Sequence, residues 1–100
     1  MKKIGSVWDG VETLEIFADK YLDGGRMAVL IVCESGEPYG DLSINAPDEV
    51  FGIEPKEFIL NHNVSTSIQV RLLASCIFED TGKRVHYGMV RNQPVWRLVG

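Results

Sequence analysis

The 100-residue sequence lacks the features that identify several large classes of protein. No apolar run approaches the roughly 20 residues that a transmembrane helix needs. The N-terminal Met-Lys-Lys is soon followed by Gly5 and Ser6 rather than by an apolar stretch, so we expect no signal peptide. The Gly24-Gly25 pair has no Lys-Ser or Lys-Thr after it, which argues against a phosphate-binding loop. We therefore expect a soluble, cytoplasmic protein that does not bind a membrane.

Cysteine and histidine are scarce, with two of each. Cys33 and Cys76 have apolar neighbours and belong to no CxxC pair, so we expect buried, reduced thiols and neither a metal site nor a cofactor. His62 and His86 have no carboxylate at strand or helix spacing that would orient the imidazole ring. With no catalytic constellation in view, we expect that the protein is not an enzyme.

The charge is distributed unevenly along a chain whose net charge is −4, which argues against direct nucleic-acid binding. Residues 34–57 hold seven acidic residues and one lysine, whereas residues 58–100 hold five basic and two acidic residues. The candidate acidic patch consists of Asp48, Glu49, Glu54 and Glu57. Such a patch could imitate phosphates and attract a basic partner. The alternative is that these acids only keep loops and strand edges solvated.

Residue patterning predicts one α+β domain over residues 1–100, since the chain has the length of a single domain. Alternating or continuous apolar runs predict strands at residues 11–18, 27–32, 39–45, 57–61, 84–90 and 94–99. One amphipathic stretch predicts a helix over about 65–77 that stops before Gly82. Thr66 and Gln69 have the spacing of a capping box, and Ser65 or Asn63 could be the cap instead. We expect a single antiparallel sheet of about five or six strands with this helix packed on one face.

A polar row is expected on one face of the strand at residues 39–45, because strand side chains alternate. The candidate binding residues in this row are Tyr39, Asp41, Ser43 and Asn45. They would offer an aromatic ring for contact, with hydrogen-bond donors and acceptors for specificity. The alternative is a solvated strand face without a partner.

Trp96 and Arg97 are further binding candidates, because Trp and Arg are enriched at interface hot spots. A chain this small also needs its large side chains for the core, which is the other interpretation of Trp96. Arg97 could form a basic patch with Arg84 and Arg91. If the acidic residues of one copy met that patch on another, a homodimer would result.

The run Gly-Glu-Pro-Tyr-Gly-Asp-Leu-Ser-Ile-Asn at residues 36–45 resembles a GEPYxxLSxN motif, and residues 77–82 and 94–98 resemble later parts of the same family. That family consists of small domain-of-unknown-function proteins encoded by bacteriophages, plasmids and integrative elements. The resemblance implies an accessory protein of a mobile element that acts in the bacterial cytoplasm. It implies no catalytic residues.

These observations favour a non-catalytic interaction module that binds a protein of the host or of the element, for example to inhibit a host defence or regulatory protein. A second hypothesis is a small-ligand protein that binds or sequesters a metabolite or a nucleotide, with a pocket between sheet and helix or at a dimer seam. A third is a structural or virion-associated component.

Overall fold

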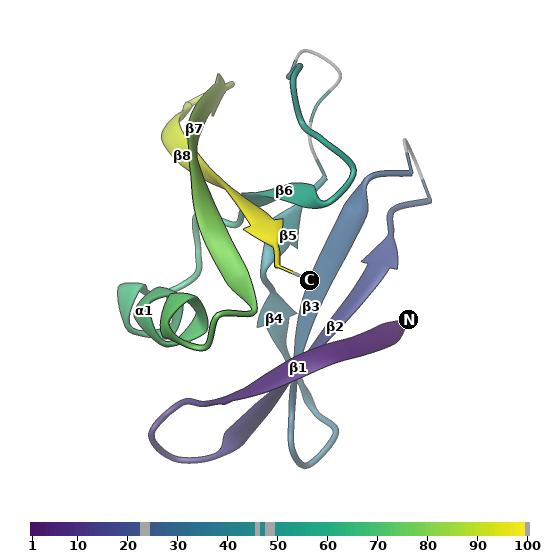
Figure 1. Cartoon of the computed structure of the whole chain (residues 1–100), viewed down its shortest axis with the longest axis vertical. Coiled ribbons are helices and arrows are strands. Elements are labelled where there is room, and N and C mark those ends of the chain that lie inside the picture. The colour runs from purple at the N-terminus through teal and green to yellow at the C-terminus, as the bar shows by residue number, and fades with distance from the viewer. Residues whose placement is uncertain (23–24, 46, 48–49, 100) are drawn as a thin grey trace.

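A computed structural model describes residues 1–22, 25–45, 47 and 50–99. Two four-stranded antiparallel sheets and one helix make up the described part (Figure 1). The first sheet is a meander in chain order, formed by β1 (Lys2–Trp8), β2 (Thr13–Lys20), β3 (Met27–Cys33) and β4 (Pro38–Asp41). The second sheet has the order β5-β6-β8-β7. Its strands are β5 (Ser43–Ile44), β6 (Glu57–Leu60), β7 (Phe78–Tyr87) and β8 (Val90–Leu98), and α1 (Thr66–Ala74) joins β6 to β7.

The predicted α+β class is confirmed, but the strands form two sheets instead of one. The chain passes from the first sheet to the second at Leu42, which is completely buried. Its amide donates to the Val29 carbonyl on β3 at 2.9 Å, and its carbonyl accepts from the Asn61 amide just after β6 at 2.8 Å. The strand predicted at residues 39–45 is therefore divided into β4 and β5. Strand β1 was not predicted, because its sequence shows no clear alternation.

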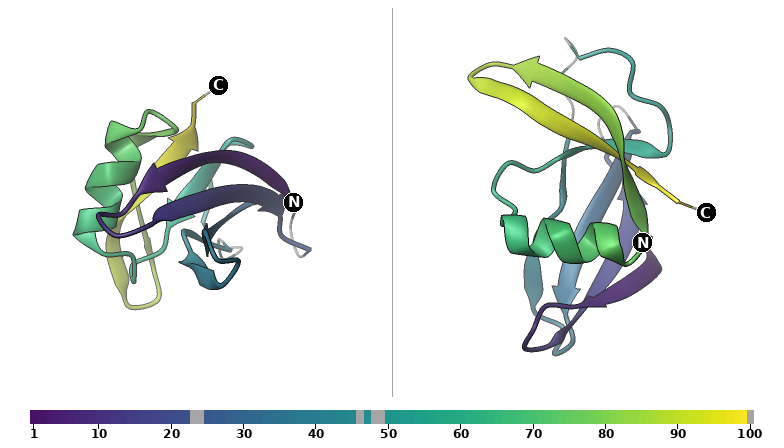
Figure 2. Two further views of the ribbon diagram at one scale, coloured as in Figure 1. Left: turned by 90° about the horizontal axis from the view of Figure 1, so that it is seen from below. Right: turned by 60° about the vertical axis from the view of Figure 1, so that its left-hand side comes forward.

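The core lies between the two sheets and includes inward-facing residues of both. At its centre the rings of Phe58, Phe78 and Trp96 meet, with centroid distances of 5.4 to 6.3 Å. The right-hand view of Figure 2 shows α1 lying alongside the first sheet with β7 and β8 above it. Ile68 and Leu72, one helical turn apart, are the buried residues of α1 and pack into this core.

The helix begins where the sequence predicts and ends earlier. Ser65 is the N-cap, and its hydroxyl accepts a hydrogen bond from the Ile68 amide at 3.3 Å. The last helical residue is Ala74, and Cys76 has a positive φ of 63°, which stops the helix before residue 77. Cys76 is consequently exposed, not buried on the helix stripe as predicted. No helix in the described part is long and apolar enough to cross a membrane.

The last two strands are longer than predicted and form a bent hairpin. Gly82 does not stop the helix. It lies inside β7 with a φ of 84°, where the register with β8 is irregular between Asp80 and Arg84. Pro94 lies inside β8, opposite Arg84 at the end of that irregular stretch, and does not begin its strand. A proline, which cannot donate a backbone hydrogen bond, is tolerated in a strand where the pairing with the neighbouring strand is irregular.

Candidate interaction surface

Tyr39 is the extra residue of a β-bulge in the edge strand β4. In the register of β4 with β3, Gly40 is opposite Ile31 and Pro38 is opposite Val32, so that Tyr39 has no partner. A bulge changes the direction of a side chain and is typical of functional positions at sheet edges. The Tyr39 side chain is 45% exposed, and all four residues of β4 are exposed. The strand therefore presents an aromatic ring at the surface.

A cavity of about 340 Å³ lies beside Tyr39, between β4 and the start of α1. Its lining residues come from β3, β4, the loop after β6 and the first turn of the helix: Ile31, Tyr39, Gly40, Asp41, Asn61, Asn63, Val64, Ser65 and Ile68. Asp41 is the one charged residue in this lining. The cavity is thus lined by both apolar residues and residues with polar side chains.

Asn61 holds this cavity together through hydrogen bonds to the end of β4 and to the start of the loop before α1. Its side-chain amide donates to the Asp41 carbonyl at 3.0 Å, and its side-chain oxygen accepts from the Asn63 amide at 3.0 Å. Its backbone amide bonds to Leu42. Asn61 was not among the site residues predicted from the sequence. An asparagine at the end of an apolar strand, followed by a helix cap, was the signal that could have found it.

Four acidic residues gather at the end of the first sheet, where the β1–β2 and β3–β4 turns lie side by side (Figure 1). A hydrogen bond from the Glu34 amide to the Thr13 carbonyl at 3.1 Å joins the two turns. We call this region the acidic end; it consists of Asp9, Glu12, Glu34 and Glu37. It differs from the predicted acidic patch and lies next to β4 in the chain. Trp8, 53% exposed, borders it.

Hydrogen bonds and charges define the ionisation of the acidic end. The Asp9 carboxylate accepts from the backbone amides of Glu12 and Val11, each at 2.7 Å, and these bonds lower the pKa of Asp9. Partial burial, together with the negative charges of Glu12, Glu37 and Asp9, raises the pKa of the Cys33 thiol. Asp9 is therefore charged at neutral pH, whereas Cys33 remains a protonated thiol.

The other chemistry-bearing residues form no cluster in the described part of the chain. There, no group of three or more His, Cys, Asp or Glu residues could hold a metal ion. His62 is exposed in the loop before α1. The His86 Nδ1 atom accepts a hydrogen bond from the Asn92 amide at 3.2 Å. Both cysteines are free, Cys33 partly exposed and Cys76 exposed. The prediction of two buried thiols is wrong at Cys76.

Ser43 lies in the interior, although it was predicted in the exposed polar row. Its side chain is 2% exposed, and its hydroxyl oxygen accepts from the Val29 amide at 2.8 Å and lies 2.8 Å from the Tyr21 hydroxyl. The break at Leu42 changes which side chains point inward, so that the alternation expected for residues 39–45 is not kept. Asn45 is exposed and lies beyond the end of β5.

Replacing Ser43 by alanine is expected to lower the free energy of unfolding by about 1–3 kcal/mol, because the buried Val29 amide would lose its acceptor. Urea unfolding followed by circular dichroism measures the change. Ser35→Ala, in an exposed turn, should change the stability by no more than about 0.5 kcal/mol. Equal effects of the two substitutions would contradict the structural role of Ser43.

The two binding candidates on β8 have different environments, since Trp96 is a core residue and Arg97 is a surface residue. Trp96 is 1% exposed and packs against Phe58 and Phe78, which removes it from the accessible surface. Arg97 is exposed and forms an ion pair with Glu79 on the neighbouring strand β7. Alternation along β8 explains the difference, since adjacent residues of a strand point to opposite faces.

The predicted acidic patch is only partly visible. Asp48 and Glu49 lie outside the described residues. Glu54 is exposed, but Glu57 is buried at 3% exposure on β6, where the Lys83 ammonium group bonds to its Oε1 at 2.8 Å. The Glu54 backbone amide donates to the same oxygen at 3.0 Å. Glu57 is thus a structural carboxylate and does not lie on an open acidic surface.

Burial alone would raise the pKa of Glu57, but the hydrogen bonds from Lys83 and from the Glu54 amide, with the charges of Lys83 and Arg97, outweigh it and lower the pKa. A lowered folded-state pKa stabilises the fold above the unfolded-state pKa, and this stabilisation is lost as the pH falls through the folded-state pKa. Glu57→Gln should therefore cost on the order of 1 kcal/mol at pH 7, since Lys83 is partly solvated.

The difference between wild type and Glu57→Gln should shrink as the pH falls below the ordinary pKa of glutamate, and it should disappear below the lowered folded-state pKa, where the carboxyl group is protonated in both states. Urea unfolding of both proteins at pH 7 and at pH 3 tests this expectation. Glu54→Gln, which removes an exposed carboxylate, provides the control. A wild-type advantage over Glu57→Gln that is unchanged at pH 3 would show that the charge of Glu57 is not the cause.

The three C-terminal arginines bond within the chain. Arg84 pairs with Asp80 at 3.0 Å, Arg97 pairs with Glu79, and Arg91 donates to the carbonyls of Gly88 and Val90. Their expected meeting with the acidic residues of a second copy remains a prediction. Arg84 and Arg97 already pair with acids of their own chain, which weakens the electrostatic reason for such a dimer.

Comparison with family models, with curated proteins and with solved structures found no match for this chain. The resemblance of residues 36–45 to proteins of mobile elements therefore remains a prediction from the sequence. The functional assignment depends on what the surface around Tyr39 can bind.

Proposed function

We propose that the protein is a non-catalytic interaction module of a phage or another mobile element, and that it binds a basic surface of a partner protein. The observation that carries the proposal is the exposed Tyr39 ring, on the bulge of an edge strand, next to the cavity and the acidic end. An aromatic anchor with polar groups around it is typical of interface hot spots.

The geometry of the cavity supports a polar or basic side chain as its occupant. Asp41 is the charged residue among the lining residues, which also include the polar Asn63 and Ser65 and the buried, apolar Ile31 and Ile68. A lysine or arginine of the partner has the same two-part character, with an apolar stem and a charged head. Contacts from Asn61 hold the cavity in one arrangement, which limits the entropy lost on binding.

The acidic end supports the proposal that the partner's surface is basic. Its four acidic residues lie at one end of the first sheet, while Arg84 and Arg97 pair with acids of their own sheet. Arg71, whose charge lowers the pKa of Asp9, offsets part of this negative charge. The remaining excess of like charges speeds encounter with an oppositely charged surface. The proposed partner, a host or element-encoded protein, would approach this end and place an anchor beside Tyr39.

The test is affinity capture from a bacterial lysate with the tagged chain, followed by measurement of the binding constant with the purified partner. The variant Tyr39→Ala/Asp41→Asn removes one exposed aromatic ring and one charge from the surface. The matched control Phe51→Ala/Glu54→Gln removes the same two features from the loop before β6, where both residues are exposed. We expect the first variant to bind about 30-fold more weakly and the control to bind as the wild type does.

The control also separates the two acidic regions of the chain, because Glu54 belongs to the acidic patch predicted from the sequence. Binding lost in the control and kept in the Tyr39 variant would contradict the proposed site. A binding constant unchanged in both variants would contradict it as well. Circular dichroism and thermal unfolding of each variant establish that the fold is retained.

A further inference from the structure

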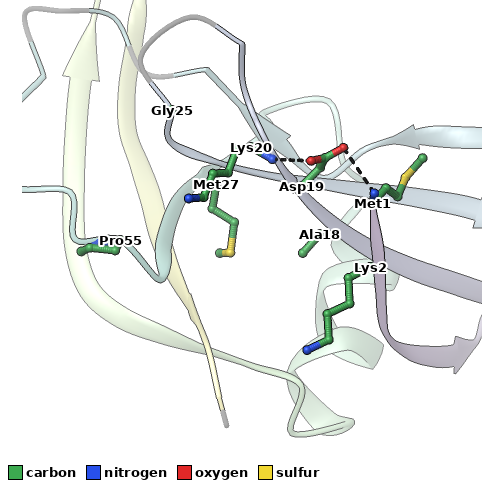
Figure 3. Close-up of a pocket in the computed structure, with 8 residues that line it drawn as sticks. All are labelled: Met1, Lys2, Ala18, Asp19, Lys20, Gly25, Met27 and Pro55. Atoms are coloured by element: carbon green, nitrogen blue, oxygen red, sulfur yellow. Dashed lines mark hydrogen bonds and ion pairs between the residues drawn. The ribbon is translucent and has the colours of Figure 1, made fainter.

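A second pocket lies at the open end of the core, away from Tyr39. It has a volume of about 560 Å³, within the range typical of sites for small molecules. Figure 3 shows the Met27 side chain in the middle of this pocket, with Ala18 and Lys2 on one side and Pro55 on the other. Lys20 completes the rim above Met27.

The strand registers explain why lysines lie at this position. Leu14 and Ile16 of β2 point into the core, and strand alternation places Ala18 and Lys20 on the same face. Lys20 is opposite Met27, which packs against the core, and Lys2 is opposite Ala18. The core-facing rows of β1 and β2 therefore end in ammonium groups, where the space between the sheets opens to solvent.

The charge at this opening is positive. Among the described residues, neither Lys2 nor Lys20 forms an ion pair through its side chain, and the only acid in the lining is Asp19. The Asp19 carboxylate is 3.8 Å from the Met1 amino group and also accepts from the Lys20 backbone amide. By contrast, Lys3 lies on the other face of β1 and pairs with Glu15 at 3.0 Å.

We infer that this pocket binds a small amphipathic anion, a carboxylate with an apolar chain. The chain would lie between Met27, Ala18 and Pro55, displacing water from apolar surface. The carboxylate would lie at the rim, where Lys2 and Lys20 contribute positive charge. A pocket at the mouth of a β-structure, with an apolar wall and a few charged groups, is a common arrangement for such ligands. This site is separate from the proposed protein-binding surface.

Decanoate, with decanol as its uncharged counterpart, is the probe. The ¹⁵N-labelled chain, tagged at its C-terminus to leave Met1 and Lys2 accessible, is titrated with each compound, and amide chemical shifts are recorded. We expect saturable shifts at Ala18, Lys20 and Met27 with decanoate. Decanol should bind about tenfold more weakly, since it lacks the charge that two lysines recognise.

Lys20→Gln and Lys3→Gln are a matched pair of variants. The first removes a positive charge from the pocket, and the second removes one from the other face of the sheet. Lys20→Gln should weaken decanoate binding about fivefold, whereas Lys3→Gln should leave it within about twofold of the wild type. Ala18→Phe, which fills the pocket, should abolish the shifts if that variant folds. Equal binding of decanoate and decanol, equal effects of the two lysine substitutions, or the absence of saturable shifts at these amides would each overturn the inference.

Discussion

Trp96→Ala is expected to lower the free energy of unfolding by about 3–5 kcal/mol. The residue is 1% exposed, and its ring lies 6.3 Å from that of Phe58 and 6.0 Å from that of Phe78. Removing the indole ring would leave a cavity beside Phe58 and Phe78 and would also remove the ring contacts of Trp96 with both. A domain of this size has a stability of only about 5–15 kcal/mol, so that much of it would be lost.

Urea unfolding monitored by circular dichroism measures this loss, with Trp96→Phe as a milder variant that keeps an aromatic ring. Trp8→Ala is the control, because Trp8 is 53% exposed and should contribute little to stability. If Trp96→Ala unfolded at the same urea concentration as the wild type, Trp96 would not lie in the core, and its interpretation as a surface anchor would return.

The largest effect on binding is expected from reversing charges at the acidic end. Glu34→Lys/Glu37→Lys changes the local charge by four units at exposed positions of the β3–β4 turn. Like charges brought together across an interface cost several kcal/mol, so binding of a basic partner should weaken by at least about 100-fold. Binding of the wild type should also weaken as salt is added, because salt screens exposed charges.

The matched control is Asp19→Lys/Glu54→Lys, which makes the same change in charge at exposed positions away from the acidic end. Its binding should fall by less than about tenfold, through the change in net charge alone. Calorimetric titration of the partner at two salt concentrations compares the two charge-reversal variants with each other and shows how salt affects binding of the wild type. Equal losses in the two variants would show that net charge matters and that the acidic end has no special role.

The local features of the fold could be predicted from the sequence. An amphipathic run with candidate caps at Thr66, Ser65 and Asn63 marked the start of α1, although the structure has Ser65 as the cap. The continuous apolar run at residues 27–32 marked the central strand β3. Each of these signals depends on neighbouring residues only. The α+β class followed from them, since one helix and several short strands need a common core.

The arrangement of the sheets could not be predicted, because it depends on contacts between distant parts of the chain. The transfer of the strand at Leu42 needs Val29 on one side and Asn61 on the other. Nothing in the local pattern distinguishes Ser43, whose hydroxyl serves a buried amide of β3, from a solvated serine. Glu57 likewise looked like a surface acid, because its partner Lys83 is 26 residues away.

The candidate site was predicted in part. Tyr39 and Asp41 are exposed beside a cavity, in agreement with the expected polar row. The row itself does not continue, since Ser43 turns inward. The acidic end combines two turns that the sequence separates by more than twenty residues, and only the order of the strands brings them together. A single sequence shows each turn but not their proximity.

The most direct test of the interaction surface is a comparison of backbone amide spectra of the ¹⁵N-labelled chain, free and bound to its captured protein partner. We predict that binding causes the largest spectral changes at residues 37–41, at Asn61 and Asn63, and in the turn at residues 9–12. Changes concentrated instead on β7 and β8, with residues 37–41 unaffected, would contradict it.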